Sequence, residues 1–206
     1  MIQTNDGGIL LRELSHRTAN TLQVAVAALH LGRRGRSDLI DDALDRIGGA
    51  ADLHGLLANV PAARDPLDAL VDICHATRRA AGASARVELD FDLRPVEIPP
   101  DSAGPIGMIV TELVSNSIRH AFGGGPGRIS VSIGPSPAGV EIAVEDDGSC
   151  AGWSRSGGQG RGIVDGLAAA LGGVLIRTRT PSGSARVVMT LPPSRRSREA
   201  IATEAA

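Results

Sequence analysis

One helix-forming segment decides how the fold of this 206-residue chain is interpreted: Glu112-Leu113-Val114-Ser115-Asn116-Ser117-Ile118-Arg119-His120-Ala121-Phe122. Apolar side chains at helical spacing, from Ile109 to Ile118, predict a helix with one buried side. Glu112, Asn116 and His120 recur every four residues, so a helix places a carboxylate, a carboxamide and an imidazole in one stripe. Such a stripe either lines a cavity that can hold a hydrated cation and phosphates, or faces water as the polar side of an amphipathic helix.

Glycine-containing segments follow this helix along the chain. Val144-Glu145-Asp146-Asp147-Gly148 ends a predicted strand, and Gly158-Gln159-Gly160-Arg161-Gly162-Ile163-Val164 begins a predicted helix, where small residues let backbone amides approach phosphates. Gly183-Ser184-Ala185 lies between two later predicted strands. Taken in this order, the four segments resemble the asparagine box and the three glycine boxes of two-component sensor histidine kinases.

The resemblance implies that these segments bind ATP and Mg²⁺. It implies that Asp146 accepts a hydrogen bond from the adenine amino group, and that Asn116 is the protein ligand of the metal, because Mg²⁺ keeps several waters and needs few protein ligands. Glu112 is expected to position water near the metal, and Arg119 or His120 to contact phosphate. The other residues expected to bind the cofactor belong to the glycine boxes: Gly148, Gly158, Gly160 and Arg161.

The N-terminal run Leu11-Arg12-Glu13-Leu14-Ser15-His16-Arg17-Thr18-Ala19-Asn20-Thr21-Leu22-Gln23 resembles the phosphoacceptor segment of the subgroup that reads Glu-Leu-x-His-Arg-x-x-Asn-x-Leu-Gln. The resemblance implies that His16 is the residue phosphorylated. Glu13 and Arg17 flank it within one helical turn. Glu13 could fix the imidazole tautomer and Arg17 could meet the phosphoryl group. Alternatively, the two form a surface ion pair without chemical function.

Three features depart from the family pattern. Cys150 stands where the first glycine box usually has its second glycine, so the backbone there turns less freely. The loop from Ser149 to Gly157 is short for an ATP lid. Arg161 replaces the usual leucine and either contacts phosphate or faces solvent.

The chain is predicted to contain two domains and a tail. Residues 1–62 form a helical hairpin, in which the second helix begins near Ser37 and has an apolar side. One hairpin cannot cover both of its apolar stripes, so a second copy is expected to complete a four-helix bundle, and we predict a homodimer. Residues 63–192 form the ATP-binding domain, and residues 193–206 a disordered tail. The apolar side of the second helix consists of Ile40, Leu44, Ile47, Ala51 and Leu57.

Pattern and turn signals predict the elements of the second domain. Asp65 and Pro66 begin a helix that ends near Gly82, and a strand with one buried face follows over 85–93. A helix over 101–122, strands near 128–134 and 139–146, a helix near 161–171, and strands near 174–180 and 184–191 complete it. The fold class is therefore α+β, with a two-layer α/β sandwich. This order resembles the ATPase fold of histidine kinases, gyrase, heat-shock chaperones and mismatch-repair proteins.

Composition excludes several other functions. With 21 Lys and Arg against 23 Asp and Glu, and 1% aromatic residues, nucleic-acid binding is disfavoured. The chain contains no lysine, which excludes a lysine-dependent phosphate loop. Cys74 and Cys150 lack metal-ligand spacing. Since no stretch approaches the ~20 apolar residues that span a bilayer, we expect a cytoplasmic protein without membrane insertion.

The predicted reaction is ATP-dependent autophosphorylation of His16, followed by transfer to an aspartate of a response regulator receiver domain. Because the chain begins close to the phosphoacceptor helix, the signal is expected from a separate sensor or upstream signalling protein. Two alternatives stay open. One is a histidine phosphotransferase that shuttles phosphate between receiver domains without ATP, and the other is a non-catalytic adaptor.

Overall fold

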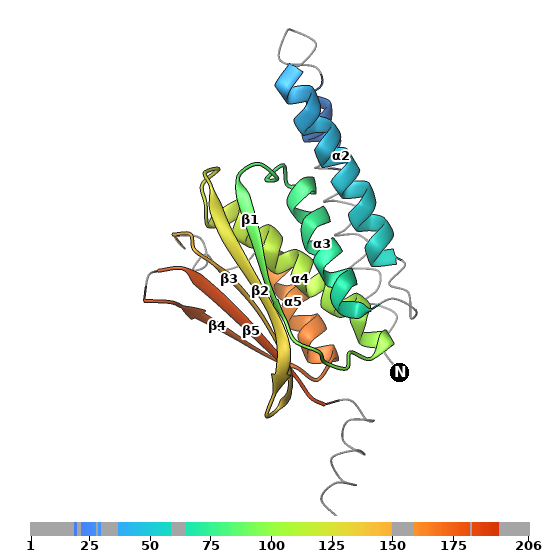
Figure 1. Cartoon of the computed structure of the whole chain (residues 1–206), viewed down its shortest axis with the longest axis vertical. Helices are drawn as coiled ribbons and strands as arrows, with labels where there is room; N and C mark the ends of the chain where they lie inside the picture. The colour runs from blue at the N-terminus through green and yellow to red at the C-terminus, as the bar shows by residue number, and fades with distance from the viewer. Residues whose placement is uncertain are drawn as a thin grey trace, which may run out of the picture.

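A computed structural model describes residues 19, 22–27, 29, 37–58, 65–149, 159–181 and 183–193. In this part of the chain the architecture has two layers, a mixed sheet and a layer of helices that covers one of its faces (Figure 1). The α+β sandwich predicted for the second domain is therefore confirmed. The N-terminal segment before residue 19 and the tail after residue 193 lie outside the described residues.

Five strands form the sheet in the order β1-β2-β3-β5-β4. The pair β1 and β2 is parallel, whereas the pairs β2–β3, β3–β5 and β4–β5 are antiparallel. This arrangement places the carboxyl end of β3 beside the start of β5, at Glu145 opposite Arg186. The strands are β1 (Val87–Leu93), β2 (Gly127–Ser136), β3 (Gly139–Asp146), β4 (Val174–Arg179) and β5 (Ala185–Leu191).

Alternating side chains explain why the sheet is covered on one face. In β1 the apolar residues from Val87 to Leu93 point toward the helices, and the acidic residues between them are exposed, as the sequence predicts. β5 alternates in the same way, with Val187 and Met189 fully buried. Because side chains alternate with a period of two, one strand can face both the core and water.

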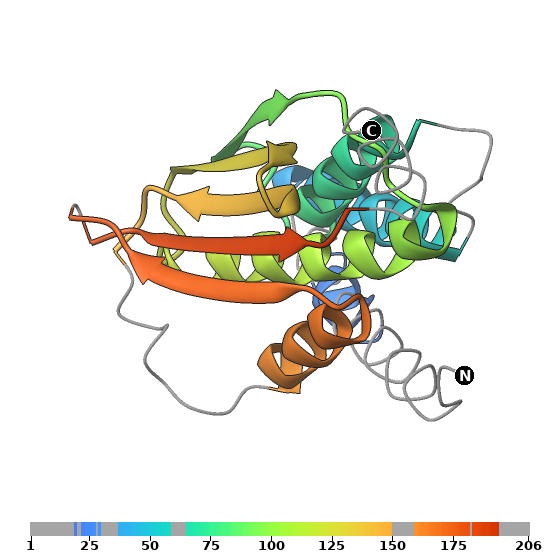
Figure 2. The same cartoon turned by 90° about the horizontal axis from the view of Figure 1, so that it is seen from below.

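Three helices cover the sheet (Figure 2): α3 (Pro66–Ala80), α4 (Pro100–His120) and α5 (Gln159–Ala170). Asp65 caps α3 as predicted, since its Oδ1 accepts a hydrogen bond from the amide of Leu67 at 2.9 Å. Helix α4 lies between α3 and α5 and contributes most to the core. Its buried apolar residues are Ala103, Ile106, Ile109, Val110, Leu113, Val114 and Ile118.

Helix α2 (Ser37–Ala58) packs along α3. The residues it buries fully are small: Ala43 and Ala50. On the predicted apolar side, Leu44 is 58% exposed and Ala51 is also exposed in the single chain. Helix α2 approaches α3 closely through alanine and glycine, so the large side chain of Leu44 is not covered by α3.

Glycine permits this close approach. A Cβ added at Gly49 would lie 2.5 Å from both the backbone nitrogen of Ala80 and the Cβ of Arg79. Gly82 turns the chain after α3 with φ +62°, and an added Cβ there would overlap the guanidinium of Arg46. Glycine is therefore required at Gly49 by the neighbouring backbone of α3 and at Gly82 by the positive φ, since the guanidinium of Arg46 is the movable end of its side chain.

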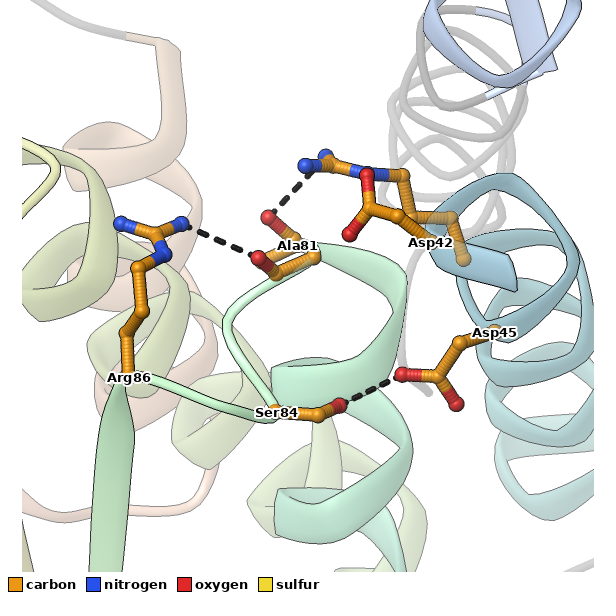
Figure 3. Close-up of polar contacts among 7 residues, drawn as sticks. Asp42, Asp45, Ala81, Ser84 and Arg86 are labelled. Carbon is orange, nitrogen blue, oxygen red and sulfur yellow. Dashed lines mark hydrogen bonds and ion pairs between the residues drawn. The ribbon is translucent and has the colours of Figure 1, made fainter. Parts of the chain in front are cut away.

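Ion pairs and hydrogen bonds complete this contact, which we call the α2–α3 joint. Its residues are Asp42, Asp45, Arg46 and Asp52 of α2, and Arg79, Ala81 and Ser84 at the end of α3 and after it. Asp45 accepts hydrogen bonds from Arg79 Nε at 2.8 Å and Ser84 Oγ at 2.6 Å. Arg79 also pairs with Asp52 at 2.6 Å. Arg46 donates to the carbonyl oxygen of Ala81, close to the hydrogen bond between Ser84 and Asp45 (Figure 3). The hydrogen bond from Ser84, followed by the charge of Arg79, lowers the pKa of Asp45 against the opposing effect of burial.

Candidate functional site

The most distinctive polar group of the sandwich is the carboxylate of Asp146, which is 1% exposed at the end of β3. A buried carboxylate needs hydrogen-bond donors, and three described groups supply them. Ser117 Oγ of α4 donates to Oδ2 at 2.8 Å. The backbone amides of Gly148 and Ala185 donate to Oδ1 at 3.3 Å and 3.4 Å.

These donors belong to three of the segments singled out in the sequence. Ser117 follows Asn116, Gly148 belongs to the first glycine box, and Ala185 ends the short Gly183-Ser184-Ala185 run. Gly183 has φ +92°, which lets the chain turn into β5 so that the Ala185 amide reaches Asp146. The fold thus brings segments up to 68 residues apart in the sequence to one carboxylate.

The first glycine box also packs against the end of α4. Ser149 donates its amide to the carbonyl oxygen of Ala121 at 3.1 Å, and an added Cβ at Gly148 would lie 2.5 Å from that oxygen. Gly148 therefore allows the chain leaving β3 to cross the C-terminus of α4. This crossing places Asp146 beside the turn of α4 that carries Asn116 and Ser117.

The predicted stripe on α4 is not uniform in exposure. Glu112 is 5% exposed, Asn116 is half-buried and His120 is exposed. Glu112 does not face water, because α4 is enclosed by α3, α5 and the sheet over its central turns. Asn116 and His120 lie on the last two turns, where α4 emerges from the core.

Positive charge surrounds the exposed end of this helix. Arg119 donates from Nε to the carbonyl oxygen of Ser115 at 3.2 Å and from Nη2 to Asn116 Oδ1 at 3.4 Å. Partial burial, and after it the charge of Arg119, lowers the pKa of His120, so that its imidazole is neutral at pH 7. Arg119 is thus the permanently charged group at this position, and His120 is a neutral donor or acceptor.

The second glycine box begins α5. Gly160 lies in the first turn of α5, and the side chain of Arg161 is exposed. An added Cβ at Gly162 would meet nothing within 4 Å, so the space beside this turn is open. A helix N-terminus with open space and unpaired backbone amides suits a phosphate group.

Several predicted residues lie outside the described part of the chain. They are Glu13, His16 and Arg17 of the phosphoacceptor segment, and Gly158 and Cys150 of the loop that precedes α5. Their roles stay predictions.

The residues present fit ATP and a magnesium ion. A buried carboxylate can only accept hydrogen bonds, which suits the amino group of adenine. Among the described residues no cluster of three His, Cys, Asp or Glu could hold a metal. The side-chain oxygen of Asn116 would be the protein ligand of a magnesium ion, which beside nucleotides takes most of its ligands from phosphates and water.

Sequence reasoning missed Ser117 and the amide of Ala185. Ser117 directly follows Asn116 and is five residues after Glu112 in the sequence. It therefore does not belong to the stripe that recurs every four residues. A serine on the buried side of a helix predicts a hydrogen-bond partner elsewhere in the fold, since a buried hydroxyl requires one. The identity of that partner depends on the strand order, which no local pattern specifies.

Comparison with known proteins agrees with this geometry. Residues 102–195 match the family described as histidine kinase-, DNA gyrase B-, and HSP90-like ATPase. The segment contains α4 from residue 102 onward, all three glycine boxes, Asp146 and β5. This part of the sandwich thus matches the ATPase domain of that family.

Similar proteins extend this assignment to the chain. It is 30% identical over 203 residues to the sensor histidine kinase PdtaS of Mycolicibacterium smegmatis, which is 92% of this chain and 41% of that protein. The structure of the Erythrobacter litoralis EL346 blue-light activated histidine kinase matches with a TM-score of 0.56 at 25% identity, over 95% of this chain and 65% of that one. Over most of its length the chain is therefore similar to sensor histidine kinases.

A further solved structure shares the fold. A protein described as a bacterial phosphotransferase matches with a TM-score of 0.63 at 12% identity, covering 92% of this chain and 98% of that one. The chain spans less than half the length of the Mycolicibacterium relative. Within the described residues, no helix is both long and apolar enough to cross a membrane.

Proposed function

We propose that the chain is an ATP-dependent protein-histidine kinase that phosphorylates itself on His16 and passes the phosphoryl group to an aspartate of a response regulator receiver domain. The observation that carries the proposal is the buried Asp146 carboxylate, held by the asparagine-bearing helix and by the backbone of two glycine-containing segments. A protein that only relays phosphate has no need of a buried acceptor for adenine beside a half-buried asparagine.

In this reaction an imidazole nitrogen of His16 forms a bond to the γ-phosphorus of ATP, and the bond from that phosphorus to the β,γ-bridging oxygen breaks, leaving ADP. Magnesium, when bound, neutralises the phosphate oxygens. Asp146 orients the adenine, Asn116 holds the metal and Arg119 supplies a permanent positive charge near the phosphates. Glu13 would orient the imidazole and Arg17 would meet the transferred group.

We further propose that the helices before residue 62 pair with those of a second copy, which gives a four-helix bundle and a homodimer. Support comes from apolar side chains that the described part of one chain leaves exposed on both helices: Leu22, Val24, Val26 and Leu44. A side of this kind is buried in helix bundles. The mass of one chain is 21.1 kDa. Light scattering at micromolar concentration should give twice this mass for the wild type and the mass of one chain for Leu44→Glu.

The remaining partners follow from the same reaction. We place the protein in the cytoplasm, where ATP is available, with a separate sensor or upstream protein as the source of its signal. The fold alone does not separate a kinase from a shuttle, since the protein described as a phosphotransferase shares it.

Incubation with γ-labelled ATP and Mg²⁺ tests the proposal. A kinase acquires a label that is labile in acid and stable in alkali, and His16→Gln abolishes it. A shuttle stays unlabelled by ATP and accepts phosphate from a phosphorylated receiver domain, and an adaptor does neither. Either of the last two results would overturn the kinase assignment.

A further inference from the structure

The described hydrogen bonds to the Asp146 carboxylate differ in length and therefore in strength. The two backbone amides donate at 3.3 Å and 3.4 Å, which is beyond the usual range for an N–H···O hydrogen bond. The hydroxyl of Ser117 donates at 2.8 Å, within the range for O–H···O. Among the described contacts of this carboxylate, the bond from Ser117 is therefore the strongest, because hydrogen bonds to a charged acceptor weaken with distance.

Ser117 is also shielded from solvent. It is 2% exposed and lies on the side of α4 that faces the end of β3. Its neighbour Asn116 is half-buried at the surface of the same helix. Consecutive residues of one helix turn thus reach the group expected to bind the base and the region expected to hold the metal and phosphates.

From this geometry we infer that Ser117 is a positioning residue for adenine recognition: its hydroxyl fixes the orientation of the Asp146 carboxylate, so that the site prefers a base with an amino group to one without it. The inference rests on the proposed function, since it requires that ATP binds at Asp146. Without Ser117, the carboxylate loses the shortest of its described hydrogen bonds, so its orientation is less well fixed, and a misplaced acceptor discriminates poorly between bases.

Calorimetry with Mg²⁺ and two nucleotides tests the inference. The probes are ATP and purine riboside triphosphate, which lacks the amino group of adenine. In the wild-type chain ATP should bind about 10-fold more tightly than the analogue, the usual effect of one hydrogen bond to a charged group. Ser117→Ala should bring the two dissociation constants within about 3-fold of each other by weakening ATP alone.

Two variants control for loss of structure. Thr111→Val removes another buried hydroxyl of α4, which donates to the carbonyl oxygen of Gly107 at 2.8 Å, and should leave the ratio as in the wild type. Ser117→Thr keeps the hydroxyl and should retain most of the preference for ATP.

The results that overturn the inference are distinct from those that overturn the function. A wild-type ratio in Ser117→Ala, or a proportional loss for both nucleotides, would show that Ser117 has only a structural role. Failure of the wild-type chain to bind either nucleotide would overturn the proposed function, and the inference with it.

Discussion

Two regions of the molecule use a carboxylate to join segments that are distant in the sequence, and they use it differently. At Asp146 the carboxylate is buried, and its described partners are a hydroxyl and two backbone amides. At the α2–α3 joint, Asp45 and Asp52 are partly exposed and are paired with Arg79. Burial makes the first group costly to disturb, and exposure makes the second weak and sensitive to salt.

The contrast has a functional meaning. A carboxylate that recognises a ligand, as proposed for Asp146, requires one fixed orientation. A hydroxyl and backbone amides can fix it without neutralising the negative charge of the carboxylate. A contact between two helices only has to hold them together, and several weak ion pairs around a close glycine contact are sufficient. The two regions should therefore respond differently to mutation, to salt and to pH.

The largest effect is expected for Asp146→Asn. The substitution keeps the size of the side chain but turns one acceptor into a donor, which would face the amino group of adenine. ATP affinity measured by calorimetry should fall about 100-fold, as for a lost charged hydrogen bond with a donor left unpaired. Unchanged affinity would remove Asp146 from the nucleotide site. The joint variant Arg79→Ala is the control and should bind ATP like the wild type.

Gly49→Ala should produce the next largest effect, on stability. The added Cβ would lie 2.5 Å from the backbone of α3, so the two helices must separate, at a cost of about 1–3 kcal/mol in the free energy of unfolding. Gly55→Ala is the matched control in the same helix, because its added Cβ meets nothing within 4 Å. That variant should gain about 0.5 kcal/mol from helix propensity. Urea unfolding of both measures the difference, and equal effects would contradict the packing of α2 on α3.

Arg79→Ala should cost about 1 kcal/mol at low ionic strength, since two partly exposed ion pairs are lost. The loss should shrink at about 1 M salt, where the charges are screened. Arg128→Ala is the control, because Arg128 also pairs with two carboxylates, Glu88 and Asp90, but is more exposed. Its cost in thermal or urea unfolding should be smaller. A salt-independent cost for Arg79→Ala would mean that packing, and not charge, holds the joint.

The smallest effect concerns pH. The folded structure lowers the pKa of Asp45, chiefly through the hydrogen bond from Ser84. A lowered carboxyl pKa adds stability above its unfolded value, near pH 4, and this stability is lost as the pH falls through the folded value. Ser84→Ala should therefore be less stable than the wild type at pH 7, and the gap should close by about pH 2. A gap that persists in acid would assign the role of Ser84 to something other than Asp45.

Much of this organisation could be predicted from the sequence, because it depends on local patterns. The alternation from Val87 to Leu93 and the Asp65-Pro66 cap of α3 are confirmed, and so is the strand ending at Asp146. Leu44 of α2, on the predicted apolar side, is exposed in the single chain, and its burial by a second copy stays a prediction. Periodicity identifies apolar positions, but it does not reveal that glycine would bring another side of the helix against α3.

The sequence indicates which residues to place at the candidate site, but it does not indicate their contacts. The order of the motifs indicated Asn116, Asp146 and Gly148, whereas the bond from Ser117 to Asp146 depends on α4 crossing the end of β3. The contact of Ala185 depends on β5 lying beside β3, although β4 precedes it in the chain. Long-range order of this kind is a property of the folded sheet.

A crystal structure of the full chain with Mg²⁺ and an unhydrolysable ATP analogue would test the assignment of the buried carboxylate most directly. We predict that the adenine amino group lies within hydrogen-bond distance of Asp146, and that the metal is bound by the side-chain oxygen of Asn116. Nucleotide bound with its base elsewhere, or no nucleotide at saturating concentration, would contradict the kinase assignment at its centre.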